Sequence, residues 1–137
     1  MLAFSPDVIV IFLGGNDIDA TADCALRVAN GLKGIIEILK DNCREVIFIQ
    51  IEWRNFSTTR VPGLTREIYQ ERRTTINRNL KRYCSRRRIR AINTGLESIE
   101  SVRQDGVHLA SVAANRLKTK IISAIKHAVT RMESHSF

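Results

Sequence analysis

The sequence contains little cysteine, proline and glycine, and each scarcity excludes a class of protein. Its three cysteines, Cys24, Cys43 and Cys84, form no Cys-x-x-Cys spacing, which argues against a disulfide framework or a zinc knuckle and favours buried thiols in a reducing compartment. Seven glycines and two prolines among 137 residues exclude collagen-like and low-complexity chains. With 44% hydrophobic and 26% charged residues, the chain is too apolar to be disordered and suits a single domain over residues 1–137.

Long hydrophobic runs are also missing. The longest, Val8–Leu13, is too short to span a bilayer. It follows Asp7 rather than a basic segment, and Gly14-Gly15-Asn16-Asp17 follows it instead of a small-residue cleavage site. We therefore predict no signal peptide, no membrane span and no membrane partner, and we expect a cytoplasmic location for the chain as written.

Apolar segments alternate with helical patterns along the chain. Val8–Leu13 and Val46–Ile51 are continuously apolar, which is typical of strands covered on both faces, and Ile89–Ile92 is a weaker strand candidate. Apolar residues recur at spacings of three and four in the three stretches 22–39, Thr65–Cys84 and Ser111–Arg131. This order predicts an α/β domain with a parallel sheet.

The helical patterns also predict caps and inward faces. Thr21 is the expected N-cap of the first helix. The side chains expected to face inward on the second and third helices are Ile68, Ile76, Leu80, Tyr83, Leu117, Ile121, Ile125 and Ala128. The loop-like stretch 54–63 ends in Pro62-Gly63, which marks a turn before the second helix.

Gly14-Gly15-Asn16-Asp17 directly follows the first predicted strand. Ligands of open α/β sheets bind beyond the carboxyl ends of the strands, so this motif lies where a site is expected. Gly14 and Gly15 permit a sharp turn and the close approach of a substrate. The Asn16 amide can stabilise a developing oxyanion. The alternative is a plain turn in which Asp17 bonds its own backbone.

A second motif, Asp105-Gly106-Val107-His108, precedes the last predicted helix. Residues three apart on a helical turn lie on one side, so the Asp105 carboxylate can reach the His108 imidazole. Such a pair fixes the tautomer of the histidine and stabilises the imidazolium when the ring accepts a proton. The alternative is a surface aspartate in a helix-capping turn.

In combination, the two motifs resemble those of a known family. Pro6–Asp17 looks like the third sequence block of the SGNH hydrolases, the GDSL-type esterase and lipase superfamily, and Asp105–Leu109 looks like the fifth. The resemblance covers roughly Pro6 to Ile125. It implies a three-layer α/β/α flavodoxin-like fold, Ser–His–Asp hydrolysis of small-molecule, carbohydrate or lipid esters, and no cofactor or metal.

The resemblance also implies roles for single residues. Asn16 would donate to the oxyanion, His108 would be the general base and Asp105 would orient it. Gly14 and Gly15 would line the substrate site and let the substrate approach closely.

The chain departs from the family at the nucleophile. The Gly-Asp-Ser block that carries the catalytic serine is missing, and so is the glycine of the second block. Ser5 is expected at the wrong end of the sheet, and neither Ser57 nor Ser101 lies in the tight turn that exposes a nucleophile. The resemblance thus implies an N-terminally incomplete domain that is inactive as this fragment.

The missing first strand of the family is central and pairs with the strand that corresponds to Val8–Leu13. Without that partner, an apolar strand has an open edge, and open apolar edges recruit other strands. We therefore expect the chain alone to be poorly soluble, to self-associate through residues 8–13, or to need an N-terminal partner segment.

Charge is distributed unevenly. The formal net charge is +8, but residues 1–59 carry −3 and residues 60–137 carry +11. Residues 66–90 hold ten Lys and Arg, among them Arg72, Arg73, Arg86, Arg87 and Arg88. Such a density predicts, as the alternative function, a non-catalytic basic module that binds nucleic acid or another polyanion. The competing interpretation is a solvated helix face whose arginine stems cover apolar surface.

Two further candidates point to less specific chemistry. His127 and His135 do not form a metal-ligand spacing with His108, so no metal site is predicted. Trp53 follows the second predicted strand, where it would wall an acyl pocket or, more simply, pack against a loop.

Overall fold

The computed structural model describes residues 6–52, 61–93 and 111–134, without the side chains of 111–113. Its elements, in chain order, are β1 (Val8–Ile11), the short 3-10 helix η1 (Gly15–Asp17), α1 (Cys24–Lys40), β2 (Glu45–Ile49), α2 (Arg66–Arg86), β3 (Arg90–Ile92) and α3 (Ser111–Ser134).

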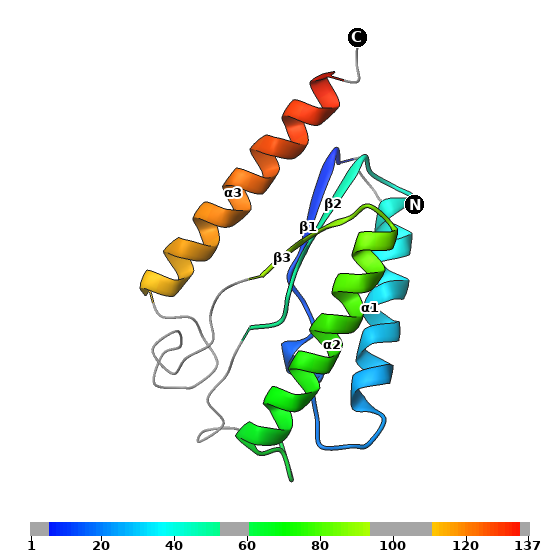
Figure 1. The fold of residues 1–137 in the computed structure, drawn as a ribbon, viewed down its shortest axis with the longest axis vertical. Coiled ribbons are helices and arrows are strands. Elements are labelled where there is room, and N and C mark those ends of the chain that lie inside the picture. The colour runs from blue at the N-terminus through cyan, green and yellow to red at the C-terminus, as the bar shows by residue number, and fades with distance from the viewer. Residues whose placement is uncertain (1–5, 53–60, 94–110, 135–137) are drawn as a thin grey trace.

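The three strands form one parallel sheet in the order β1-β2-β3. Val8 of β1 is in register with Glu45 of β2, and Ile47 of β2 is in register with Arg90 of β3. Helices α1 and α2 pack together on one face of the sheet, and α3 lies on the other (Figure 1). The predicted α/β fold with a parallel sheet is confirmed.

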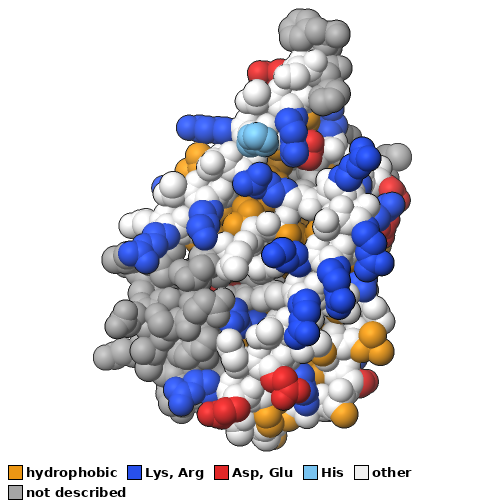
Figure 2. Space-filling view, in the orientation of Figure 1, with side chains coloured by type: hydrophobic (Ala, Val, Ile, Leu, Met, Phe, Trp, Pro, Cys, Tyr) orange, Lys and Arg blue, Asp and Glu red, His pale blue; other side chains and the backbone are white. Residues whose placement is uncertain are grey.

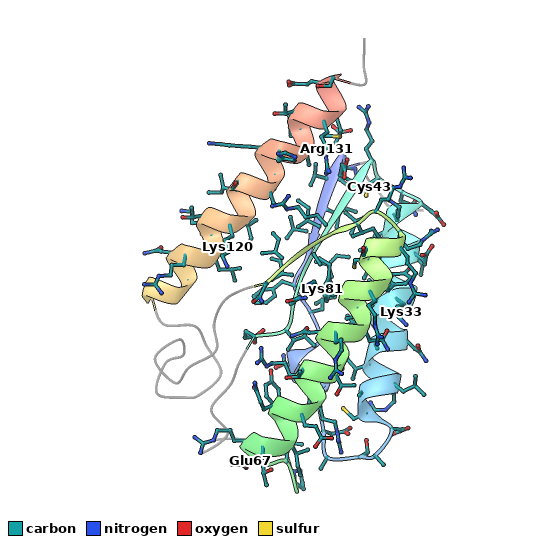
Figure 3. All side chains as sticks on the ribbon, in the orientation of Figure 1. Lys33, Cys43, Glu67, Lys81, Lys120 and Arg131 are labelled. Carbon is teal, nitrogen blue, oxygen red and sulfur yellow. The ribbon has the colours of Figure 1, made fainter. Side chains whose placement is uncertain are left out.

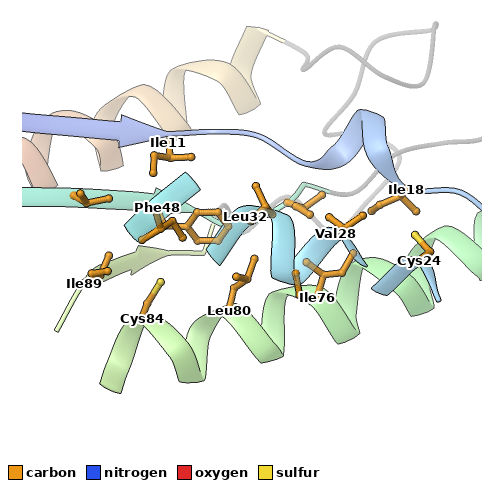
Figure 4. Close-up of a cluster of buried hydrophobic side chains, with 14 of the residues drawn as sticks. Ile11, Ile18, Cys24, Val28, Leu32, Phe48, Ile76, Leu80, Cys84 and Ile89 are labelled. Atoms are coloured by element: carbon orange, nitrogen blue, oxygen red, sulfur yellow. The ribbon is translucent and has the colours of Figure 1, made fainter. Parts of the chain in front are cut away.

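Alternation along the strands divides the buried side chains between the two faces. Ile11 of β1 and Phe48 of β2 point toward α1 and α2, where they meet Leu80 of α2 (Figure 4). Ile47 points the other way and packs against Ala124 of α3. Because both faces are covered, β2 is apolar over most of its length, as expected for a parallel strand.

The ends of several elements differ from the sequence predictions. β1 ends at Ile11, and the side chains of Phe12 and Leu13 are 41% and 49% exposed. The N-cap of α1 is Asp23 rather than Thr21, because the Thr21 hydroxyl and backbone N–H both bond to the Asp19 carboxylate. α2 begins after Thr65, whose hydroxyl accepts the backbone N–H of Ile68 at 3.1 Å.

The carboxyl end of α2 has a conformation that usually requires glycine. The N–H of Ile89 bonds to the carbonyl of Cys84 at 2.8 Å, and the N–H of Arg88 bonds to that of Ser85 at 3.3 Å, which is the Schellman pattern. Arg88 stands at the left-handed position with φ 57°. A side chain there costs roughly 1–2 kcal/mol relative to right-handed backbone.

Among the described residues, no helix combines the length and the apolar character that crossing a membrane requires.

Candidate ester-hydrolysis site

The loop after β1 has a glycine where only glycine fits. Gly14 has φ 113°, and a Cβ built on it would lie 3.0 Å from Ile51 Cδ1 and 3.1 Å from Leu32 Cδ1. The chain then turns into η1, with the N–H of Asp17 donating to the Gly14 carbonyl at 3.1 Å. The motif predicted from sequence is therefore a tight turn at the carboxyl end of β1, packed closely against the core beneath it.

This turn forms one side of a pocket. Asn16 is exposed, Gly15 is half-buried, and both line a pocket of about 370 Å³. The other lining residues are Phe12, Leu13, Gly14, Asp17 and Glu52. The predicted oxyanion donor and both predicted substrate-binding glycines thus share one pocket at the edge of the sheet where ligands of α/β folds bind.

Glu52 belongs to a wall that sequence reasoning missed. It follows β2, is only 8% exposed, and its carbonyl accepts the Tyr69 hydroxyl at 2.8 Å. Its neighbour Ile51 donates its N–H to Asn77 Oδ1 at 2.8 Å, and its carbonyl accepts Asn77 Nδ2 at 3.0 Å and Arg73 Nη1 at 3.2 Å. Backbone polar groups beyond the end of the strand are thereby satisfied by side chains of α2.

The three side chains that hold this wall are Tyr69, Arg73 and Asn77, spaced by four residues along α2. A spacing of four places side chains one above another on a single helix face. The sequence signal is a stripe of hydrogen-bonding side chains at a spacing of four, and the dense positive charge around Arg73 favours a solvent-exposed face instead.

Asp19 fixes the chain between the pocket turn and α1. Its carboxylate accepts the Thr21 hydroxyl and, at 3.0 Å, the Thr21 N–H, and it pairs with Arg27 at 2.8 Å. The hydrogen bonds from Thr21, together with the Arg27 guanidinium, lower the pKa of Asp19 to about 2. The carboxylate is therefore charged throughout the range in which the protein would work.

The remaining residues predicted for the ester chemistry lie outside the described residues. These are Asp105, His108, Trp53 and the three serines considered as nucleophiles, Ser5, Ser57 and Ser101. The structure thus positions the Asn16 side of the predicted site and makes no statement about the Asp105–His108 pair.

The five arginines predicted for a polyanion occupy different environments. Arg73 is 4% exposed and bonded inside the protein, which removes it from a surface interface. Arg72 is largely covered and pairs with Glu71 at 2.9 Å. Arg87 pairs with Glu37 at 2.7 Å, whereas Arg86 and Arg88 are exposed. Other basic side chains spread over α2 and α3 on the face shown in Figure 2.

No group of three His, Cys, Asp or Glu side chains is arranged to hold a metal ion in the described ranges. His127 is exposed on α3. The three cysteines are free thiols, with Cys24 and Cys84 buried and Cys43 half-buried. Burial raises the pKa of the Cys84 thiol to about 11, so this thiol is neutral and unreactive at physiological pH.

The solved structures of similar fold include two bacterial proteins. A GDSL-like lipase from Bacteroides thetaiotaomicron superposes with a TM-score of 0.71 at 21% identity, over 90% of this chain and 64% of its own. A protein assigned as an acylhydrolase from Bacteroides fragilis superposes with a TM-score of 0.66 at 21% identity, over 90% of this chain and 62% of its own. The chain therefore spans less than two thirds of the length of either structure.

A comparison with curated proteins finds no match. The model of the GDSL-like lipase/acylhydrolase family, in contrast, matches residues 1–115, which include both predicted motifs. The resemblance inferred from Gly14–Asp17 and Asp105–His108 is thereby confirmed at the level of the family: this chain belongs to the GDSL-like lipases and acylhydrolases.

Proposed function

We propose that the pocket beside Asn16 is the oxyanion side of an ester-hydrolysis site. The observation that carries the proposal is the Gly14 turn. Its left-handed backbone and close packing against Ile51 hold Asn16 at the carboxyl end of β1, on the rim of a pocket of about 370 Å³. A side-chain amide held rigidly at such a position can stabilise the negative charge that develops on an ester carbonyl oxygen.

In the proposed reaction, a serine hydroxyl attacks the ester carbonyl carbon and His108 accepts its proton. Asn16 Nδ2 donates a hydrogen bond to the carbonyl oxygen as it becomes an oxyanion, and Asp105 stabilises the imidazolium. His108 then returns the proton to the departing alcohol, and water releases the acyl group by the same steps. The 137 residues contain no Gly-Asp-Ser block, so we propose that they do not catalyse turnover alone and that a segment outside them supplies the serine.

The lining of the pocket favours an uncharged substrate. Among the described residues that line it, the ionisable ones are Asp17 and Glu52, and both are acidic. Carboxylates in a partly enclosed pocket repel an anionic acyl group and accept hydrogen bonds from hydroxyl groups. We therefore propose a neutral ester, such as an acetylated sugar or another small hydroxylated molecule, as the substrate class.

The test is hydrolysis of p-nitrophenyl acetate by the complete reading frame that contains these residues. Asn16→Ala should lower kcat by about 10²–10³, the loss typical of one oxyanion-hole donor. Asn30→Ala, an exposed asparagine on α1 away from the pocket, is the matched control and should leave the rate unchanged.

His108→Ala distinguishes this mechanism from nonspecific hydrolysis. It should reduce turnover of the complete protein to the background rate, and the isolated 137 residues should equal that background. Equal rates for the complete protein and its His108→Ala variant would reject the proposal.

A second candidate function is the binding of a polyanion such as nucleic acid along α2. The supporting observation is a set of exposed basic side chains on this helix: Arg66, Arg78, Lys81, Arg82 and Arg86. Binding through phosphate contacts would weaken steeply as salt rises. Filter retention of RNA that is absent, or flat between low and high salt, would remove this candidate.

We also propose that a second copy of the chain pairs with the open edge of β1. In the described part of the chain β1 bonds only to β2, and the apolar side chains of Phe12 and Leu13 are exposed beyond it. Unpaired strand edges recruit further strands. Sedimentation of the 137-residue chain should show dimers or larger species, and Phe12→Lys, at an exposed apolar position, should shift it toward monomer. A wild-type monomer at all concentrations would refute the pairing.

A further inference from the structure

A pocket of about 480 Å³ lies at the opposite end of the sheet from the candidate ester site. It is lined by Arg44, Glu45, Arg88, Arg131 and Met132. Glu45 begins β2 and Arg44 directly precedes it, Arg88 lies two residues after the end of α2, and Arg131 comes from the last turns of α3. Figure 3 shows Arg131 at this end of the molecule, on the same level as Cys43, the neighbour of Arg44.

The charge in this pocket is unbalanced. Among the described lining residues, three guanidinium groups face one carboxylate, which leaves a net charge of +2. Arg131 pairs with that carboxylate, Glu45, at 3.1 Å. The side chains of Arg44 and Arg88 form no ion pair with any residue that the structure describes. The guanidinium groups of Arg44 and Arg88 therefore remain available to an external anion.

Stabilisation of helix ends explains part of this arrangement but not all of it. Each arginine follows or ends a helix, and cations are favoured at helix C-termini. A lysine or arginine in the last turn suffices for that effect, and α1 and α2 already have Lys40 and Arg86 there. Arg88 is an additional cation, and it occupies a left-handed position that favours glycine.

We propose that Arg44, Arg88 and Arg131 form a binding site for a phosphate monoester group. A phosphate monoester carries close to two negative charges at pH 7, which matches the net charge of the pocket, whereas a carboxylate carries one. One guanidinium group can donate two parallel hydrogen bonds to two oxygens of a phosphate. The pocket volume exceeds that of a phosphate, so the organic part of a small phosphorylated molecule also fits.

The experiment is calorimetric titration of the 137-residue chain with inorganic phosphate and with glycerol 3-phosphate at constant ionic strength. Arg88→Gly should weaken binding by about tenfold or more, the effect of removing a charged hydrogen-bond donor. The same substitution relieves the left-handed backbone, so its unfolding temperature should be equal to or above that of the wild type. Lost binding with retained stability separates a ligand site from a structural role.

Two further variants sharpen the test. Arg82→Gln removes one exposed charge of α2 outside the pocket and should change the affinity less than about twofold, because salt screens it. Glu45→Gln removes the one carboxylate among the described lining residues and should tighten binding severalfold. No phosphate binding, an equal loss in Arg82→Gln, or no gain in Glu45→Gln would each overturn the proposal.

Binding to lipid vesicles distinguishes a phosphate group on a lipid from one on a soluble molecule. Vesicles of phosphatidylcholine with phosphatidic acid present the same group on a surface, and pure phosphatidylcholine is the control. If vesicles bind, with the same Arg88→Gly loss, the phosphate site serves a lipid headgroup. If only glycerol 3-phosphate binds, the site serves a soluble metabolite.

Discussion

The two faces of the sheet are packed to very different depths. The face under α1 and α2 contains sixteen of the described buried residues in one cluster, whereas the described cluster under α3 contains three: Ile47, Ile92 and Ala124. Ile122 and Val129 of α3 remain 41% and 37% exposed. Two interlocked helices bury more apolar surface than one helix across a short sheet, so the stability of the described structure resides mainly on the α1–α2 face.

The largest expected effect compares one isoleucine from each face. Ile76 of α2 is fully buried in the larger cluster, and Ile125 of α3 is half-buried beside the smaller one. Ile76→Ala should lower the free energy of unfolding by about 2–5 kcal/mol, because it removes buried methyl groups and leaves a cavity. Ile125→Ala should cost less than about 2 kcal/mol. Urea denaturation measures both values.

The two variants are each other's control, since they delete the same atoms from helical positions. Equal losses of unfolding free energy would mean that α3 is packed as tightly as α2. The two faces of the sheet would then contribute equally to stability, against this expectation.

An intermediate loss of stability is expected at Gly14, where the α1–α2 face of the sheet meets the candidate pocket. Gly14→Ala places a Cβ 3.0 Å from Ile51 and 3.1 Å from Leu32, on a left-handed backbone. The free energy of unfolding should fall by about 1–3 kcal/mol. Gly34→Ala is the matched control, because its Cβ meets no atom within 4 Å and a helix interior favours alanine over glycine. A Gly14→Ala protein as stable as the wild type would show that the turn can relax.

The smallest effect is a pH dependence from the same face. Burial raises the pKa of Cys84 to about 11, above the ordinary 9.0 of the unfolded thiol. Both states carry the neutral thiol below pH 9, but between pH 9 and 11 the unfolded state loses its proton first, so stability falls as pH rises. The loss should reach about 2 kcal/mol by pH 10.5.

Tyr83 also titrates at alkaline pH, because burial and its bond to Glu37 raise its pKa to about 12. Cys84→Ala keeps Tyr83, so the difference between the wild type and this variant isolates the contribution of Cys84. Between pH 8 and pH 10.5, the urea midpoint should fall further in the wild type than in the variant. Parallel pH profiles would assign the alkaline loss to other groups.

Much of the fold followed from the sequence, because it depends on periodicity. The strands around Val8–Ile11 and Glu45–Ile49 and all three helices were predicted within a few residues, since continuous apolar runs and spacings of three and four report burial directly. Element ends were less accurate. Phe12 and Leu13 are apolar yet lie beyond β1, and Asp19 binds the Thr21 hydroxyl that would otherwise have capped α1.

The candidate site was predictable only as far as motifs reach. The sequence motif predicted Gly14 and Asn16 as site residues, and both line the candidate pocket. The wall made by Tyr69, Arg73 and Asn77 was not predicted, because its bonds join positions that are 17–26 residues apart in the chain. The pocket of Arg44, Arg88 and Arg131 likewise depends on three helix ends converging at one edge of the sheet, which no local pattern reveals.

The bonds from α2 to the pocket wall have a mechanical consequence. Tyr69, Arg73 and Asn77 grip consecutive backbone groups of Ile51 and Glu52, and they do so from successive turns of one rigid helix. Sliding α2 along its axis would break all of these bonds together rather than one after another. The basic helix and the Glu52 side of the candidate pocket therefore move as one body.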